Sequence, residues 1–278
     1  MMNPVLNAEE LINHREEWVI VDCRYHLLQP DWGYQQYVEN HLSSARFVHL
    51  DNDLSAPKTG SNGRHPLASP EQLIKVFQHL GINQDSRVVA YDDMGGCFAS
   101  RLWWSLKWLG FDNVAVLNGG LQSWLKIGGT LTSILPQVTP GNFIGQPQEQ
   151  WVVKVDDIET NLASKEYLII DARANDRYRG ENETIDPVAG HIPGAINRPF
   201  VNNLDKDGLF KTATEINNEL TTLLSNHPQQ PIIHQCGSGV SACHNWLAMS
   251  YAGLDRTLRL YPGSWSEWVS DPTRPIVP

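Results

Sequence analysis

The chain repeats itself once, and this duplication constrains its fold more than any other feature of the sequence. Four blocks occur in the same order in each half, separated by about 145 residues. A period this long is too long for a solenoid, whose repeats span about 20–50 residues. We therefore predict two copies of one domain. The paired blocks are residues 18–24 and 167–173, 41–47 and 191–197, 86–104 and 230–248, and 118–124 and 262–268.

Each half alternates short apolar runs with stretches of helical periodicity. In the second half, residues 168–171 and 231–235 are predicted strands. Residues 215–225 and 242–253 are predicted helices, the second ending at Gly253. Alternating strands and helices favour a parallel sheet covered by helices. We therefore predict an α/β fold with two tandem domains, each a mainly parallel sheet flanked by helices.

Residues 131–150 separate the two halves. This segment is rich in Pro, Gly and Gln and poor in charge, a composition typical of an extended linker. We predict a first domain over residues 1–130 and a second domain over residues 151–278.

The composition excludes several classes of protein. The 21 basic and 31 acidic residues give a net charge of −10, which disfavours a general nucleic-acid binder but allows a local basic pocket. No apolar run of about 18 residues occurs, so we predict no membrane span. The N-terminal sequence lacks an apolar signal core, so we expect a cytoplasmic protein. The four cysteines are too few for a disulfide scaffold and show no CxxC spacing, so we expect no metal site.

Cys236 differs from the other cysteines because it lies where a strand ends and a helix is about to begin. Gly237 and Gly239 allow the backbone to curl closely, so that successive N–H groups can point inward above the positive end of the helix. An ordinary cysteine is only about 3% thiolate at pH 7, and such surroundings can lower its pKa. The same geometry would hold a persulfide anion. The alternative is a tight turn around a buried thiol.

The first half lacks this cysteine. In the alignment of residues 86–104 with residues 230–248, Asp93 falls opposite Cys236. A carboxylate cannot carry a transferable sulfur, so we predict that the first domain is catalytically inactive. Cys97 and Cys243 are expected to pack in the core.

Several motifs together resemble the two-domain rhodanese superfamily, which comprises the thiosulfate and 3-mercaptopyruvate sulfurtransferases. The resemblance covers nearly the whole chain. It implies two rhodanese-like α/β domains, the first inactive and the second active, and a ping-pong reaction through a cysteine persulfide. The motifs are Asp22-Cys23-Arg24, Asp171-Ala172-Arg173, DRYRG at residues 176–180, GHIPGAINRPF at 190–200, CGSGVSA at 236–242 and GSWSEW at 263–268.

The resemblance implies catalytic roles for four residues. Cys236 matches the nucleophile, and Ser238 matches the serine that follows Cys-Gly. Asp51 and His65 match an Asp and a His from the first domain of the family. A Ser-His-Asp relay could protonate a leaving enolate. The alternative is that Asp51 and His65 are loop residues with local hydrogen bonds.

The resemblance also implies a binding site for an anionic substrate. Arg177 matches the family arginine that binds the substrate carboxylate, and a guanidinium can do so through two hydrogen bonds. Many mercaptopyruvate enzymes carry a second arginine where this chain has Asp186, which would repel an anion; Arg179 could substitute. Arg24 and Arg173 are expected to pair with nearby acids. The turn residues expected to bind the substrate are Gly237, Gly239, Val240 and Ser241.

The sequence therefore predicts a sulfurtransferase. Cys236 would take a sulfane sulfur from 3-mercaptopyruvate or thiosulfate and pass it to cyanide, a thiol or thioredoxin, with no metal or organic cofactor. The neutral Gly237-Ser238 pair favours mercaptopyruvate and Asp186 disfavours it, so the donor stays open. One alternative is a Cys-dependent phosphatase, which usually has Cys-x5-Arg where this chain has Ala242. The other is a non-enzymatic sulfur-carrier or regulatory module.

Overall fold

The computed structural model describes residues 2–278, which form two compact units. The predicted boundary between residues 130 and 151 separates most of the two units, but two short segments pack with the other half of the chain. Local composition does not show which elements a loop packs against, so the sequence did not predict this. The first unit contains the chain up to Ala56, Ala68–Gln148 and Lys206–Phe210, and the second contains Pro57–Leu67, Glu149–Asp205 and Lys211–Pro278.

The first unit is built on a five-stranded sheet in the order β1-β6-β5-β2-β4, and all neighbouring strands are parallel. A separate antiparallel pair joins β3 to β7. The strands are β1 (Val5–Leu6), β2 (Trp18–Asp22), β3 (His41–Leu42), β4 (Arg46–Phe47), β5 (Arg87–Tyr91), β6 (Val114–Leu117) and β7 (Leu131–Thr132). The helices are α1 (Ala8–Asn13), α2 (Trp32–Glu39), α3 (Pro70–His79), α4 (Ala99–Trp108) and α5 (Gly120–Lys126), with a 3-10 turn at Arg15–Glu17.

The second unit is built on a four-stranded parallel sheet in the order β11-β10-β8-β9. The strands are β8 (Leu168–Asp171), β9 (Ile196–Asn197), β10 (Ile232–Gln235) and β11 (Leu258–Leu260). The helices are α6 (Val155–Ser164), α7 (Asn175–Tyr178), α8 (Ala213–Leu223), α9 (Ser241–Tyr251) and α10 (Ser264–Trp268), with 3-10 turns at Glu149–Trp151 and Phe200–Asn203.

Local sequence explains where α8 begins and where α9 ends. Thr212 precedes α8, and its hydroxyl accepts a hydrogen bond from the Glu215 N–H while the Glu215 carboxylate accepts one from the Thr212 N–H. After α9, Gly253 takes a left-handed φ of +68°, and the Leu254 N–H donates to the Met249 carbonyl at 3.1 Å. The predicted end of this helix at Gly253 is confirmed.

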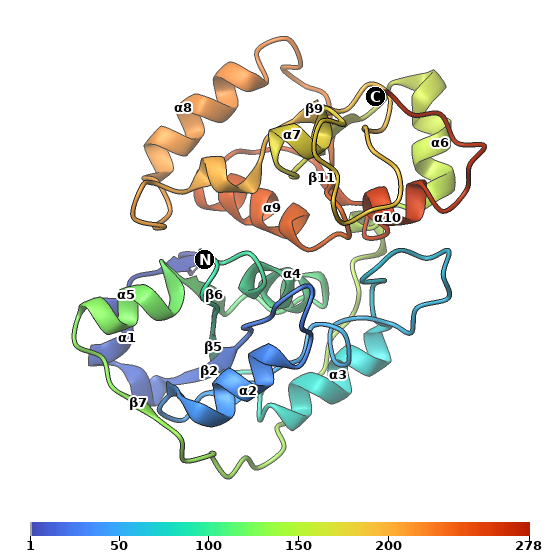
Figure 1. Cartoon of the computed structure of the whole chain (residues 1–278). Helices are drawn as coiled ribbons and strands as arrows, with labels where there is room; N and C mark the ends of the chain where they lie inside the picture. Colours follow the sequence, from blue (N-terminus) through green and yellow to red (C-terminus); the bar gives the residue numbers. More distant parts are fainter. Residues whose placement is uncertain (1) are drawn as a thin grey trace. The chain divides into compact units, whose positions relative to one another are not determined.

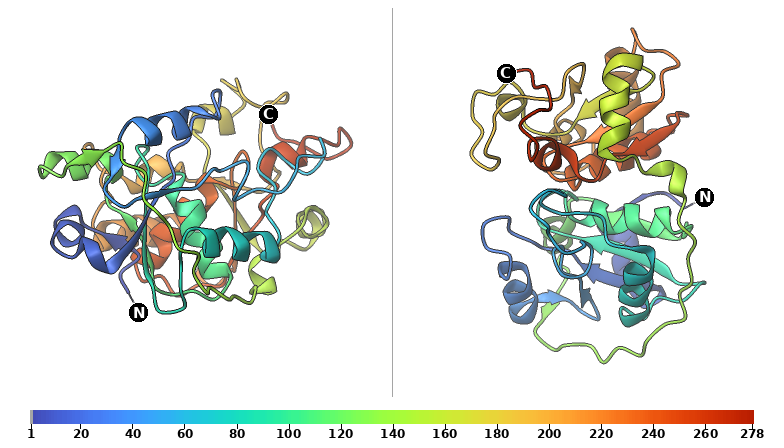
Figure 2. Two further views of the ribbon diagram at one scale, coloured as in Figure 1. Left: turned by 90° about the horizontal axis from the view of Figure 1, so that it is seen from below. Right: turned by 90° about the vertical axis from the view of Figure 1, so that its right-hand side faces the viewer.

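Both sheets are covered on both faces. The strands β6, β8 and β10 are buried along their whole length, and successive side chains of a strand point to opposite faces. Helix α4 packs against β5 and β6, and α9 packs against β10 and α8 (Figure 1). Two further views show the helices of each unit around its strands (Figure 2). The predicted α/β class, with mainly parallel sheets flanked by helices, is confirmed.

Each unit has its own apolar core, and tryptophans contribute much of it. Trp124 packs in the core of the first unit, and Trp265 and Trp268 pack in the core of the second. Trp103 and Trp246 are also buried.

The counterpart of Cys236 in the first unit is Asp92. Cys236 directly follows β10, and its carbonyl accepts a hydrogen bond from the Trp265 N–H at 3.0 Å. Asp92 directly follows β5, and its carbonyl accepts the equivalent bond from the Leu121 N–H at 2.9 Å. The prediction that Asp93 takes this place is therefore wrong by one residue. The turn between β5 and α4 is longer than the turn between β10 and α9, so an ungapped alignment shifts at the strand end.

Candidate active site

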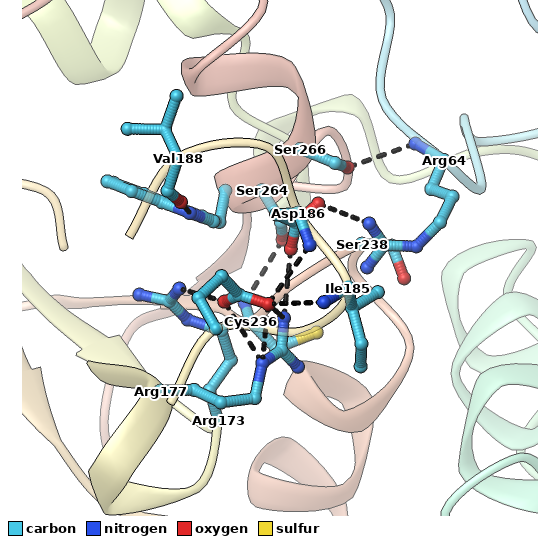
Figure 3. Close-up of polar contacts among 12 residues, drawn as sticks. Arg64, Arg173, Arg177, Ile185, Asp186, Val188, Cys236, Ser238, Ser264 and Ser266 are labelled. Atoms are coloured by element: carbon cyan, nitrogen blue, oxygen red, sulfur yellow. Dashed lines mark hydrogen bonds and ion pairs between the residues drawn. The ribbon is translucent and has the colours of Figure 1, made fainter. Parts of the chain in front are cut away.

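Cys236 lies at the carboxyl end of β10, in the turn that leads into α9 (Figure 3). It is 2% exposed, and its Sγ accepts a hydrogen bond from the Gly239 N–H at 3.1 Å. Gly239 has a φ of +76°, and a Cβ atom there would lie 2.3 Å from the Pro262 carbonyl oxygen, so a larger residue does not fit without a backbone shift. Val240 is buried, and Ser241 begins α9. The turn therefore directs a backbone donor at the sulfur.

The residues at the start of α10 hold this turn in place. Ser264 Oγ accepts a hydrogen bond from the Cys236 N–H at 3.1 Å and donates one to the Tyr261 carbonyl at 2.8 Å. The Ser266 N–H donates to the Gly237 carbonyl at 2.9 Å. Ser264 has a φ of +55°, which is unusual for a residue with a Cβ atom. Sequence reasoning did not single out Ser264, although it lies in the repeated block at residues 262–268.

Two of the predicted relay residues meet in the second unit. His65 Nδ1 lies 2.8 Å from Ser238 Oγ, and both side chains are buried. His65 lies on Pro57–Leu67, which is held to α10 because the Arg64 N–H donates to Ser266 Oγ at 3.0 Å. Asp51 belongs to the first unit, where it accepts a hydrogen bond from the Tyr25 hydroxyl at 2.6 Å.

Two arginines and one aspartate form a cluster beside Gly237, which we call the Arg64–Asp186–Arg177 cluster (Figure 3). Asp186 Oδ1 pairs with Arg64 Nη1, and Asp186 Oδ2 accepts a hydrogen bond from Arg177 Nη2 at 2.9 Å. Arg177 Nε also donates to both oxygens of Glu183, at 3.1 and 3.0 Å. A Cβ atom on Gly237 would lie 2.9 Å from Nη2 of Arg64 and 3.5 Å from Nη2 of Arg177. Both guanidinium groups therefore lie next to the Cys236 turn.

The sequence motifs indicated only part of this cluster. Arg177 lies beside the turn, and its role in binding the substrate stays a prediction. Arg64 was missed, although it directly precedes His65. Arg179 instead pairs with Glu181, and both side chains are more than half exposed.

Arg173 lies near the site, and its guanidinium is held by contacts within the protein. It pairs with Asp171 at 2.7 Å and donates to the Gly190 carbonyl at 2.8 Å, while its guanidinium lies 4.7 Å from the centre of the Trp265 ring. The interpretation of Arg173 as part of the scaffold agrees with these contacts. Arg24 makes the same pairing with its own acid, Asp22, at 2.7 Å.

Glu183 is ionised in this environment. Burial acts to raise its pKa, but the Asp186 N–H and the Arg177 guanidinium, followed by the Ile185 N–H, outweigh burial and lower the pKa below its ordinary value. The Glu183 carboxylate thus holds the Arg177 guanidinium next to the backbone of Ile185 and Asp186.

Within residues 2–278, no helix is long and apolar enough to cross a membrane. In the same range, no group of three or more His, Cys, Asp or Glu side chains is arranged to hold a metal ion.

Comparison with known families accounts for the duplication. The model of the rhodanese-like domain matches the chain twice, at residues 7–127 and 154–271. The chain belongs to the rhodanese-like family. This confirms the predicted pair of tandem rhodanese-like domains.

Rhodanese-like relatives resemble the chain over most of its length. A probable 3-mercaptopyruvate sulfurtransferase from Pseudomonas aeruginosa is 44% identical over 276 residues, covering 98% of this chain and 97% of that protein. A putative thiosulfate sulfurtransferase, SseB, from Mycobacterium tuberculosis is 40% identical and covers 92% of this chain and 89% of its own length. The solved structure of 3-mercaptopyruvate sulfurtransferase from Leishmania major superimposes with a TM-score of 0.85 at 33% identity, covering 95% of this chain and 73% of that one.

These comparisons confirm the prediction that this rhodanese-like chain is an enzyme of the sulfurtransferase class. They do not favour the phosphatase or the non-enzymatic carrier. The roles of individual site residues remain predictions.

Proposed function

We propose that this chain transfers a sulfane sulfur from 3-mercaptopyruvate or thiosulfate to a thiol, a thioredoxin-like protein or cyanide, through a persulfide on Cys236. The observation that carries the proposal is the hydrogen bond of 3.1 Å from the Gly239 N–H to Cys236 Sγ, made inside a buried turn. A backbone donor fixed in this way stabilises negative charge on sulfur without reorganising during the reaction.

The first half-reaction forms the persulfide. The Cys236 thiolate attacks the outer sulfur of thiosulfate or the thiol sulfur of 3-mercaptopyruvate, and a new S–S bond forms. The bond from that sulfur to the rest of the donor breaks, and its electron pair leaves with sulfite or with the enolate of pyruvate. Sulfite needs no proton, whereas the enolate must gain a proton on carbon to give pyruvate. Loss of the thiol proton from the transferred sulfur, which leaves the persulfide as an anion, balances this step.

Ser238 and His65 support this proton transfer. Their side chains are 2.8 Å apart, so the hydroxyl can pass a proton to the enolate while the imidazole exchanges one with the hydroxyl. Asp51 enters the proposal as the third member of the relay only through the family resemblance. The contact that supports the relay directly is the one between His65 and Ser238.

The donor anion is proposed to bind at the Cys236 turn. Arg177 and Arg64 supply the positive charge, and the backbone of Gly237, Gly239, Val240 and Ser241 surrounds the sulfur. An arginine can hold a carboxylate through two parallel hydrogen bonds. Arg179 is left out of this site because its guanidinium pairs with Glu181.

In the second half-reaction, the acceptor takes the outer sulfur. The acceptor thiolate or cyanide attacks that sulfur, the S–S bond of the persulfide breaks, and the Cys236 thiolate is restored. We place the reaction in the cytoplasm, because the four cysteines form no disulfide within residues 2–278, as expected in a reducing compartment.

The first unit is proposed to be catalytically inactive. Asp92 stands where Cys236 stands in the second unit, and a carboxylate cannot accept a transferable sulfur. Its oxygens instead accept hydrogen bonds at 2.7–2.9 Å from the backbone N–H groups of Met94, Gly96, Phe98 and Ala99. The anion-binding turn of the first unit is thus filled by a side chain of the protein itself.

Steady-state kinetics test the proposed function. Initial rates with cyanide as acceptor are measured at several fixed concentrations of each donor, beside hydrolysis of p-nitrophenyl phosphate. The proposal predicts thiocyanate from both donors, double-reciprocal plots with parallel lines, and no phosphatase activity. Phosphate release without sulfur transfer would contradict it.

A further inference from the structure

We propose that Asp186 is a built-in carboxylate that occupies the Arg64–Arg177 pair and competes with the anionic group of the donor for it. Asp186 thereby sets the affinity of the enzyme for carboxylate donors. This inference rests on the proposed function of the site, but it concerns anion binding rather than the chemistry of sulfur.

The contacts of Asp186 are those expected of a bound carboxylate ligand. One oxygen pairs with Arg64, the other accepts a hydrogen bond from Arg177 at 2.9 Å, and the side chain is only 1% exposed. Both guanidinium groups lie next to Gly237, the residue after the nucleophile. A small carboxylate that approached Cys236 would need these same donors.

The charges of the cluster are already balanced. Arg64 and Arg177 provide two positive charges, and Asp186 and Glu183 provide two negative charges. Arg173 lies close by, with Nη1 3.5 Å from Glu183, but its charge is balanced by Asp171. An incoming anion therefore meets no net positive charge unless it displaces Asp186. A neutral side chain at this position would leave one positive charge for the donor.

The segment that carries Asp186 is anchored on either side of it. Glu183 holds Arg177 and accepts hydrogen bonds from the N–H groups of Ile185 and Asp186 at 2.9 and 3.0 Å. The Val188 carbonyl accepts one from the Trp265 indole N–H at 2.9 Å (Figure 3). These anchors do not use the Asp186 carboxylate, so its removal should leave the segment and Arg177 in place.

Calorimetric binding of pyruvate, a carboxylate that donates no sulfur, tests the inference. The measurements use the full chain carrying Cys236→Ser, with Asp186→Asn and Asp186→Ala as test variants. The matched control is Glu181→Gln, which removes a carboxylate from the same segment at an exposed position. Because a charge-assisted hydrogen bond is worth about 10–150-fold in affinity, we expect Kd for pyruvate to fall by that factor in both test variants and to stay constant in the control.

The kinetic counterpart uses chains that retain Cys236. Asp186→Asn should lower KM for 3-mercaptopyruvate by a similar factor and leave kcat nearly unchanged, because the freed arginines bind ground and transition states alike.

Unchanged or weaker pyruvate binding in variants that keep the wild-type melting temperature would overturn the inference, since Asp186 would then only position the arginines. Failure of both variants to fold would also overturn it. Tighter pyruvate binding in the test variants, together with no persulfide on the chain that retains Cys236, would support the inference and refute the proposed function alone.

Discussion

His65 Nδ1 lies 2.8 Å from Ser238 Oγ, although the two residues are 173 positions apart in the chain. Ser238 belongs to the Cys236 turn, and His65 belongs to Pro57–Leu67, which the structure groups with the second unit. The contact therefore lies within one compact unit and brings a titratable base to the second residue after the nucleophile.

Loss of this contact should slow the reaction with 3-mercaptopyruvate much more than the reaction with thiosulfate. We expect Ser238→Ala and His65→Gln to lower kcat with 3-mercaptopyruvate by about 10²–10⁴-fold, the usual contribution of general acid–base catalysis. The rate with thiosulfate should fall much less, because sulfite leaves without gaining a proton. Steady-state rates with each donor measure the difference, and His227→Gln is the control. An equal loss with both donors would mean that the pair only positions the turn.

Arg177 is expected to act in donor binding. Arg177→Leu should raise KM for 3-mercaptopyruvate by about 10–150-fold, the loss expected for a charge-assisted hydrogen bond. Arg179→Leu is the matched control, because Arg179 pairs with an exposed glutamate and should not affect KM. If Arg177→Leu leaves kcat/KM unchanged for both donors, Arg177 is part of the scaffold.

His234 makes the stability of the protein dependent on pH. It is fully buried on β10, neither ring nitrogen has a hydrogen-bond partner within residues 2–278, and burial lowers its pKa from 6.5 to about 3. Between these two pH values the unfolded chain binds a proton that the folded chain excludes, so stability falls as pH falls through this range.

Replacement of His234 should remove this pH dependence. The contribution is about 1.4 kcal/mol per pH unit, so His234→Leu should reduce the loss of unfolding free energy between pH 7 and pH 5 by about 2 kcal/mol. Urea denaturation at the two pH values measures it, with His227→Leu as the control. If the unfolding free energy falls equally in His234→Leu and in the wild type between pH 7 and pH 5, the folded protein does not exclude a proton from His234, and the prediction is wrong.

The sequence predicted those parts of the fold and site that depend on local pattern. The duplication and the alternation of apolar runs with helical periodicity predicted two parallel sheets, and Gly253 marked the end of α9. The turn from Cys236 to Ser241 was visible because glycines, a strand end and a helix start are adjacent in sequence.

Contacts between distant segments could not be predicted in this way. Arg64 was missed because nothing in residues 57–67 indicates that the segment packs on α10. Asp186 was expected to repel an anion, but its pairing with two arginines depends on how that segment folds. The counterpart of Cys236 was misplaced by one residue because unequal turn lengths cannot be seen without strand register.

Cys236 is the proposed nucleophile, and the other cysteines provide its controls. Cys97 and Cys243 are buried, and burial raises the pKa of the Cys23 thiol well above its ordinary value. We expect Cys23→Ser, Cys97→Ser and Cys243→Ser to affect mainly stability, because a thiol needs thiolate character to attack a sulfur donor.

The intact mass of the protein after treatment with 3-mercaptopyruvate or thiosulfate shows whether Cys236 carries the sulfur. We expect one added sulfur in the wild type and in the three control variants, removed again by cyanide, and no added sulfur in Cys236→Ser. A cyanide-labile sulfur on another cysteine of Cys236→Ser would contradict it.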